Sequence, residues 1–144
     1  MEKIYHPTNV DIDRCLTFAT ASVDSHYNNN RRTRDEIIED IVVGKLGEIA
    51  FQSWFPGIGP PKLKPTKDPD PGWDLLRDNG DRIQVKTLNE GTKWVSFDNW
   101  NWDFIAAIRF IPNENCFRLL HINTKSTING IAKKSKFGGW YYNP

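Results

Sequence analysis

The sequence predicts a mixed α/β domain, and three features of its hydrophobic pattern carry that prediction. Apolar residues in 36–55 recur three and four positions apart, as on one face of a helix. After residue 71 apolar and polar residues alternate instead, which is typical of half-buried strands. A short helical segment then precedes a last strand. This order of helix, strands, helix and strand indicates helices packed on a sheet within a single domain of 144 residues.

Two helices are predicted before residue 56. Residues 11–27 carry a moderate apolar stripe, which ends at Asn28–Asn30 because asparagine side chains compete for backbone hydrogen bonds. Thr33 and Glu36 have the spacing of a capping box, so the second helix begins there. Pro56 follows its end. Its apolar stripe is the widest in the chain and contains Ile38, Ile41, Val42, Leu46, Ile49, Ala50 and Trp54.

A loop and a series of strands follow. Residues 56–71 hold six of the nine prolines and three lysines, so we expect an extended loop. The alternating pattern predicts strands at about 73–78, 81–88, 104–111 and 115–122, and a less regular one near 93–97. Thr124 or Ser126 caps a short helix that runs to about Lys134, and a last strand covers 140–142.

Composition excludes several classes of protein. A hydrophobic fraction of 38% and a charged fraction of 26% are those of a globular domain, and no apolar run approaches the ~18 residues of a membrane span. The first residues lack the apolar core of a signal peptide. Cys15 and Cys116 are too few for a disulfide framework, so we expect buried thiols in a reducing compartment. We therefore expect a cytoplasmic protein encoded by a bacterium, a phage or a mobile element. The thirteen asparagines would suit a phage or mobile-element gene.

Basic residues are clustered, although the net charge is only +1. Such clusters hold phosphates in nucleic-acid-binding proteins, whereas the simpler interpretation is that they are solvated loop ends. The clustered side chains, which we take as candidate DNA contacts, are Arg31, Arg32, Arg34, Lys62, Lys64, Lys67, Lys133, Lys134 and Lys136.

Polar residues of two predicted strands can meet across a hairpin. Gln84 and Lys86 are two positions apart in one strand and therefore share a face. A two-residue loop would put Asp74 opposite Val85, on the other face. A three-residue loop, 78–80, with its glycine in the left-handed region, would pair Asp74 with Gln84. We therefore predict the three-residue loop if these side chains form a site. The alternative is an ordinary hairpin with polar residues facing solvent.

These residue types suit a hard metal ion. The carboxylate of Asp74, the amide oxygen of Gln84 and the carbonyl of Val85 are oxygen ligands of the kind that Mg²⁺ prefers. Glu48, on the flank of the long helix at the border with the sheet, can reach such an ion through a water. Lys86 can orient an attacking water or hold a phosphate as a point charge.

Two glycines interrupt the long helix beside Glu48. Gly44 and Gly47 each cost the helix about 1 kcal/mol relative to alanine. Such glycines are tolerated where a helix must pack close to a sheet. We therefore expect a close approach at this point.

These motifs, in this order, resemble the PD-(D/E)XK nuclease superfamily, which includes restriction enzymes and repair and recombination nucleases. The resemblance spans residues 43 to about 111, and its motif positions fall on Glu48, Asp74, Gln84 and Lys86. It implies a restriction-endonuclease-like core of helix, three strands, helix and strand, with a central mixed sheet flanked by helices. Residues 34–144 would form this catalytic core and residues 1–33 a helical extension of the same domain.

Two residues depart from the family pattern. Gln84 stands where most members carry glutamate or aspartate, although glutamine occurs there in Mrr-like restriction enzymes and in a small homing endonuclease. The exchange removes one negative charge and should weaken metal binding without abolishing it. Gly72-Trp73 precedes Asp74, so the Pro-Asp dipeptide of the family is absent there. Asp70 follows a proline but lies in the proline-rich loop, which makes it the poorer candidate.

The resemblance implies an endonuclease that hydrolyses DNA phosphodiester bonds, of restriction or homing type, with Mg²⁺ as cofactor and Mn²⁺ able to replace it. Double-stranded DNA would be the partner, with no membrane and no small-molecule cofactor. One such site cuts one strand, so cleavage of a duplex implies a homodimer or homotetramer. The alternatives are a structure-specific nuclease for junctions or repair, and a non-catalytic DNA-binding protein on a nuclease-derived fold. The residues implied as catalytic are Glu48, Asp74, Gln84 and Lys86, and those implied as metal-binding are Asp74, Gln84, Val85 and Glu48.

Two further features are assigned mainly to packing. The aromatic segment 94–102 could stack on bases or join two copies, but core and interface packing is the favoured interpretation. His121 lies at the end of an apolar strand and is expected to be a hydrogen-bonded core histidine rather than a catalyst. A small-molecule hydrolase is disfavoured because no nucleophile–base pair is visible.

Overall fold

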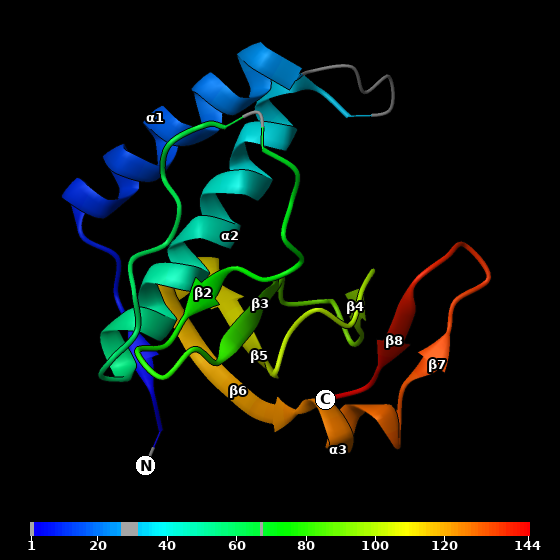
Figure 1. Ribbon diagram of the computed structural model, residues 1–144. Coiled ribbons are helices and arrows are strands. Elements are labelled where there is room, and N and C mark those ends of the chain that lie inside the picture. Colours follow the sequence, from blue (N-terminus) through cyan, green and yellow to red (C-terminus); the bar gives the residue numbers. More distant parts are fainter. Residues whose placement is uncertain (1, 27–31, 67) are drawn as a thin grey trace.

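The computed structural model describes residues 2–26, 32–66 and 68–144, and it confirms the mixed α/β class. Two long helices come first, and strands form most of the rest (Figure 1). The elements are β1 (Ile4–Tyr5), α1 (Asn9–His26), α2 (Arg34–Trp54), β2 (Leu75–Leu76), β3 (Arg82–Leu88), β4 (Val95–Phe97), β5 (Phe104–Ile111), the 3-10 turn Pro112–Glu114, β6 (Cys116–Thr124), α3 (Lys125–Asn129), β7 (Lys133–Lys134) and β8 (Trp140–Tyr142).

Five of the strands form a mixed sheet in the order β1-β6-β5-β3-β2. The β3–β5 pair is parallel and the other pairs are antiparallel. In the central strand β5, residues 105–108 are fully buried, because both faces of the sheet are covered there. A second, antiparallel sheet has the order β4-β8-β7. Figure 1 shows α2 lying over one face of the large sheet, with α1 packed on α2 and the β7–β8 hairpin at the other side of the molecule.

The two faces of β3 pack against different parts of the protein. Ile83 and Val85 belong to the core cluster that includes Leu46 and Ile49 of α2. Leu88 belongs to a second cluster, which is built around Trp102, Phe97 and Ile128. Because side chains alternate along a strand, Gln84 and Lys86 share the face of Leu88, away from α2.

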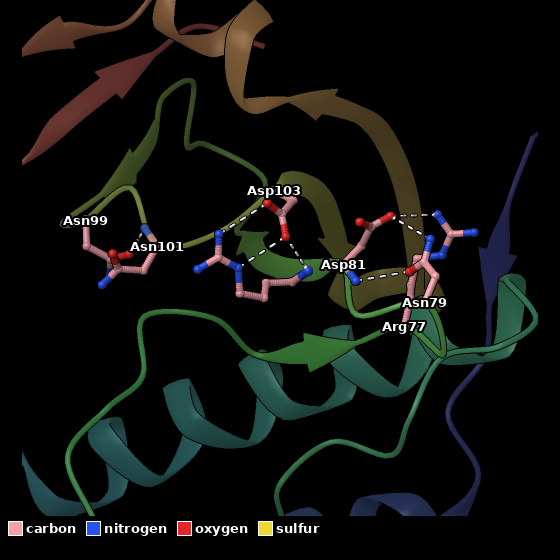
Figure 2. Close-up of polar contacts among 7 residues, drawn as sticks. Arg77, Asn79, Asp81, Asn99, Asn101 and Asp103 are labelled. Atoms are coloured by element: carbon pink, nitrogen blue, oxygen red, sulfur yellow. Dashed lines mark hydrogen bonds and ion pairs between the residues drawn. The ribbon is translucent and has the colours of Figure 1, made fainter.

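Asp103 joins the starts of three elements, and Figure 2 shows the hydrogen bonds of its carboxylate. Its carboxylate accepts hydrogen bonds from the Arg82 backbone N–H at 2.8 Å and from Nε and Nη2 of the same arginine at 3.1 and 3.2 Å. Its own N–H donates to the Arg82 carbonyl, and its carbonyl accepts from Lys125 N–H at the start of α3. The Arg82 guanidinium lowers the pKa of Asp103. These bonds fix the parallel register of β3 and β5.

The loop between β2 and β3 has the three residues that the sequence predicts. The pairs Leu75↔Ile83 and Leu76↔Arg82 set the register, and Arg77 N–H donates to the Asp81 carbonyl at 2.9 Å. Gly80 has φ +93°, a conformation that favours glycine. Figure 2 shows Asn79 and Arg77 bonded to Asp81 across the loop, which holds its shape.

Several element boundaries differ from the sequence-based expectation. The first strand covers only 75–76 rather than 73–78, because pairing is interrupted at Asp74. The helix after β6 begins as expected at its Thr124 cap but ends at Asn129, since Ile131 N–H and Ala132 N–H both turn back to the Ile128 carbonyl. Residues 133–134 therefore form β7. Five strands separate α2 from α3, as the alternating pattern predicts, rather than the three that the family resemblance implies.

Three simpler expectations can be compared with the structure. Cys15 and Cys116 are both buried free thiols, as predicted. Within the aromatic segment, Trp102 and Phe97 are core residues, whereas Trp94 is 50% exposed. Among the described residues, no helix has the length and apolar character needed to cross a membrane.

Only one of the two α2 glycines is required by a close approach. A Cβ at Gly47 would overlap Thr87 Oγ1 and lie 3.2 Å from Thr87 Cβ, whereas a Cβ at Gly44 would meet nothing within 4 Å. We therefore predict that Gly47→Ala lowers the free energy of unfolding by about 1–3 kcal/mol through overpacking. Gly44→Ala should raise it by up to about 1 kcal/mol through helix propensity. Urea denaturation measures both.

The matched control is Gly47→Ala in a Thr87→Ala background, where the overlapping side chain is gone. We expect that double variant to recover most of the loss, which gives a favourable coupling energy between the two sites. Equal effects of alanine at Gly44 and Gly47, or no recovery in the double variant, would contradict this account of helix placement.

Candidate functional site

Glu48 is the only charged side chain that is buried among the described residues, with an exposed fraction of 6%. It lies on α2 one turn after Lys45, whose Nζ is 3.2 Å from Glu48 Oε1. The close approach of α2 to the sheet at Gly47 carries Glu48 to the border between helix and strands. A buried carboxylate is costly unless a partner or a bound cation compensates it, so this position is a candidate site.

Asp74 lies at the edge of β3, next to the end of β2. Its backbone N–H donates to the Ile83 carbonyl at 2.9 Å, and its Oδ2 accepts a hydrogen bond from Val85 N–H at 2.8 Å. Because Leu75 is also opposite Ile83, two residues face one, as in a β-bulge. The three-residue loop was expected to pair Asp74 directly with Gln84, and this pairing does not form. The ladder ends at Leu75, and the bulge turns the carboxylate of Asp74 onto the edge of β3.

The backbone of Val85 offers a second oxygen at this edge. The N–H and C=O of one residue in a strand point to the same side, and Val85 N–H points to Asp74. The Val85 carbonyl therefore also faces the edge, beyond the end of β2. This carbonyl is the metal ligand predicted from the sequence.

Lys86 approaches Asp74 from the face of β3 opposite α2. Its charge lowers the pKa of Asp74, as does that of Lys45 from the helix side. Gln84 is half-buried on the same face as Lys86. The structure thus brings Glu48, Asp74 and Lys86 around one strand edge, with Asp74 between the other two.

Burial raises the pKa values of both acids, and a neighbouring carboxylate raises each further, Asp74 for Glu48 and Asp70 for Asp74. The pKa of Glu48 is raised to about 8, first by burial and then by the charge of Asp74, and these effects outweigh the opposing effect of Lys45. The pKa of Asp74 is also raised by burial, although the Val85 N–H and the two lysines oppose the shift. Two carboxyl groups that resist simultaneous ionisation form a place where a proton or a cation is favoured.

The donor set fits Mg²⁺ better than a softer metal. In the described part of the chain, no group of three or more His, Cys, Asp or Glu residues is arranged to hold a metal ion. Two carboxylates, a carbonyl and an amide oxygen are all hard ligands. Mg²⁺ commonly binds one or two carboxylates and keeps several waters, so the small number of acids is compatible with it. A cation here would also offset the repulsion between Glu48 and Asp74.

Two further charged residues, Lys45 and Asp70, act on this site without having been predicted to do so. Lys45 contacts Glu48, and its three-residue spacing on a helix is a signal that could have revealed it. Asp70, set aside as the poorer candidate, accepts a hydrogen bond from Gly72 N–H, and its charge contributes to the raised pKa of Asp74. It therefore lies within electrostatic reach of the site.

The candidate DNA contacts fall into three groups. Arg32 and Arg34 form exposed ion pairs with Asp40 and Asp24, which offset their charges. Lys62 lies over the Trp73 ring at 5.0 Å, and Lys64 is exposed on the same loop. The three C-terminal lysines, 133, 134 and 136, are exposed on and beside β7. Arg31 and Lys67 lie outside the described residues.

His121 is hydrogen-bonded, as the sequence predicts, but it is half-buried rather than a core residue. Its Nε2 is 3.0 Å from the Tyr142 hydroxyl, and burial lowers the pKa of the imidazole. It contacts the second sheet and lies on the strand β6 rather than at the Asp74 edge.

No protein-family model matches the chain, and no curated protein matches its sequence. The assignment of a function therefore depends on the geometry of the site.

The raised pKa of Glu48 predicts a pH-dependent stability in metal-free buffer. A carboxyl group whose folded pKa is about 8, against an ordinary value of 4.5, favours the folded state when protonated. Its contribution is fully present below pH 4.5 and is lost as the pH rises through 8. Glu48→Gln should therefore flatten the fall in stability over this range. Urea midpoints at several pH values, measured with EDTA, test this.

The control for this experiment is Glu39→Gln, at an exposed glutamate of the same helix. We expect Glu39→Gln to keep the wild-type pH profile. A Glu48→Gln profile parallel to that of the wild type would show that Glu48 titrates normally and would contradict the electrostatic description of the site.

Proposed function

We propose that this protein is a Mg²⁺-dependent endonuclease that hydrolyses phosphodiester bonds in double-stranded DNA. One observation carries the proposal. The Asp74 carboxylate is hydrogen-bonded to the edge of β3 and interacts electrostatically with Glu48 from α2 and with Lys86 from β3. Acids and a lysine from three elements at one strand edge are the groups that metal-assisted phosphodiester hydrolysis needs.

Each residue has a distinct role in this proposal. Asp74, the Val85 carbonyl and the Gln84 amide oxygen would hold Mg²⁺, and Glu48 would reach it through a water. When bound, the ion supplies Lewis-acid activation and neutralises charge on the phosphate. Lys86 orients the attacking water or holds a phosphate oxygen. Lys45 is a positioning residue, because it acts on the site through its contact with Glu48.

Oligomeric state, type of cleavage and cellular compartment are also part of the proposal. Cleavage of both strands requires two sites, so the protein would act as a homodimer or homotetramer on a two-fold symmetric target. We favour site-specific cleavage of restriction or homing type, with Mn²⁺ able to replace Mg²⁺. The cytoplasm is the proposed compartment, because Cys15 and Cys116 are free thiols.

A second candidate is supported by one observation. Gln84 leaves the strand edge with one carboxylate fewer than most nucleases of the family that the sequence resembles. A non-catalytic DNA-binding protein on a nuclease-derived fold would have this composition. Junction-resolving or repair cleavage is the same chemistry on a different DNA and is distinguished by the substrate alone.

The cleavage assay uses Mg²⁺ with genomic, plasmid and four-way-junction DNA. We predict discrete products from the wild type and a loss on the order of 10²–10³-fold in rate for Asp74→Asn and for Lys86→Ala, since the first removes a charged metal ligand and the second the cation that acts on the water or the phosphate. Quantified gel products measure the rates.

Matched controls are Glu90→Gln and Lys93→Ala, which make the same charge changes at exposed positions after β3. Both should keep wild-type rates. If the wild type binds DNA but cleaves none of these substrates, the non-catalytic candidate is correct. Equal cleavage by the wild type and the Asp74→Asn variant would contradict the assignment of the site.

A further inference from the structure

The C-terminal part of the chain carries charge of one sign. All eighteen acidic residues lie at or before Glu114, whereas five of the nineteen basic residues lie after it. Three of these five, Lys133, Lys134 and Lys136, occur within four positions and are exposed. A local surface of this kind attracts a polyanion, even though the whole chain is nearly neutral.

These lysines are carried by a defined hairpin rather than a loose tail. Strand β7 pairs with β8 through Lys133↔Tyr141 and Lys134↔Trp140. At the turn, Ser135 N–H donates to the Gly139 carbonyl at 3.0 Å. Directly after the turn, the Trp140 ring packs on Phe97 with a centroid distance of 6.0 Å. Figure 1 shows the hairpin extending away from the helices and the large sheet.

Phe137 lies at the tip of this hairpin and is 98% exposed. Its N–H donates to Ser135 Oγ at 3.2 Å, which fixes its place in the turn. Gly138 and Gly139 follow with φ +96° and +72°, and a Cβ at Gly139 would lie 2.7 Å from the Phe97 carbonyl. The tip is thus packed closely on β4 while Phe137 remains in solvent. A large aromatic side chain that a hydrogen-bonded turn holds in solvent is suited to insertion into a binding partner.

We propose that the β7–β8 hairpin is a DNA-contacting element in which Phe137 inserts between bases while Lys133, Lys134 and Lys136 contact phosphates. This inference rests on the proposed function for the identity of the partner. Two-stranded ribbons enter DNA grooves, and phenylalanine is one of the side chains that wedge between base steps. At about 3.4 Å per residue, the three lysines lie within roughly 14 Å of Phe137, which is comparable to the ~12 Å major groove.

DNA fits this hairpin better than a second copy of the chain does. In a symmetric dimer through the tip, the same surface meets itself, so the lysines of one copy would face those of the other. Residues 115–144 contain no Asp or Glu, and the Asp98 carboxylate, which lies beside Gly139, is a single negative charge against three lysines. A duplex supplies phosphates for the lysines and base planes for the aromatic ring.

The test measures binding of a 20-base-pair duplex in EDTA, where cleavage is absent, with 2-aminopurine at alternate positions to report unstacking. We predict that the wild type increases 2-aminopurine fluorescence. Phe137→Ala should lose this increase and bind about 10-fold more weakly, with an unchanged salt dependence. Replacing the three lysines by glutamine should reduce the slope of log K against log salt by up to about 3.

Two controls change similar groups elsewhere. Val10→Ala removes a 67% exposed apolar side chain from α1, and Arg14→Gln removes an exposed positive charge there. Both should leave binding and fluorescence unchanged. All of the substituted side chains are exposed, and thermal denaturation verifies that each variant is folded.

The outcomes separate this inference from the proposed function. Wild-type binding and fluorescence in Phe137→Ala overturn the inference, even if DNA is cleaved. A change confined to the oligomeric state, measured by sedimentation, also overturns it, because Phe137 would then contact a second copy. Phe137-dependent unstacking without any cleavage supports the inference and contradicts only the proposed enzymatic activity. Failure of the wild type to bind DNA contradicts both.

Discussion

The buried carboxyl group of Glu48, held beside Asp74, constrains the rest of this structure. Burying a carboxyl group next to another acid is unfavourable, and the pKa of about 8 for Glu48 expresses that cost. The helix nevertheless carries the residue to this place, since Gly47 lets α2 approach Thr87 closely. Lys45 compensates part of the charge from the same helix. A bound cation would offset the repulsion in such a pair, which is why we propose a metal site here.

Two local features position the strand edge to which Asp74 is hydrogen-bonded. The hydrogen bonds between Arg82 and Asp103 set where β3 begins beside β5. The three-residue turn sets where β2 lies along β3, and the bulge at Asp74 then ends the pairing and frees the edge of Val85. The Arg82–Asp103 contact and the three-residue turn both lie outside the proposed site. They place Lys86 on one side of Asp74 and α2 on the other.

Much of this arrangement could be predicted from the sequence. The apolar periodicity predicted α2 and the full extent of β5, and the parity of side chains along a strand predicted the three-residue loop. The bulge at Asp74 could not be predicted, because it depends on a tertiary hydrogen bond to Val85. Strands β1 and β7 have only two residues each, too few to show a period. No role was predicted for Lys45, because its importance depends on the burial of its partner Glu48, which only the folded structure shows.

Calorimetric titration of Mg²⁺ and of Mn²⁺ near pH 7, in buffers of different ionisation enthalpy, determines whether the edge of β3 binds a cation. We expect one site in the wild type, with a proton released from Glu48 as the cation binds. We expect no binding in Asp74→Asn, and weaker binding without proton release in Glu48→Gln. If the wild type binds neither cation, or if Asp74→Asn binds as the wild type does, the edge of β3 is not a cation site.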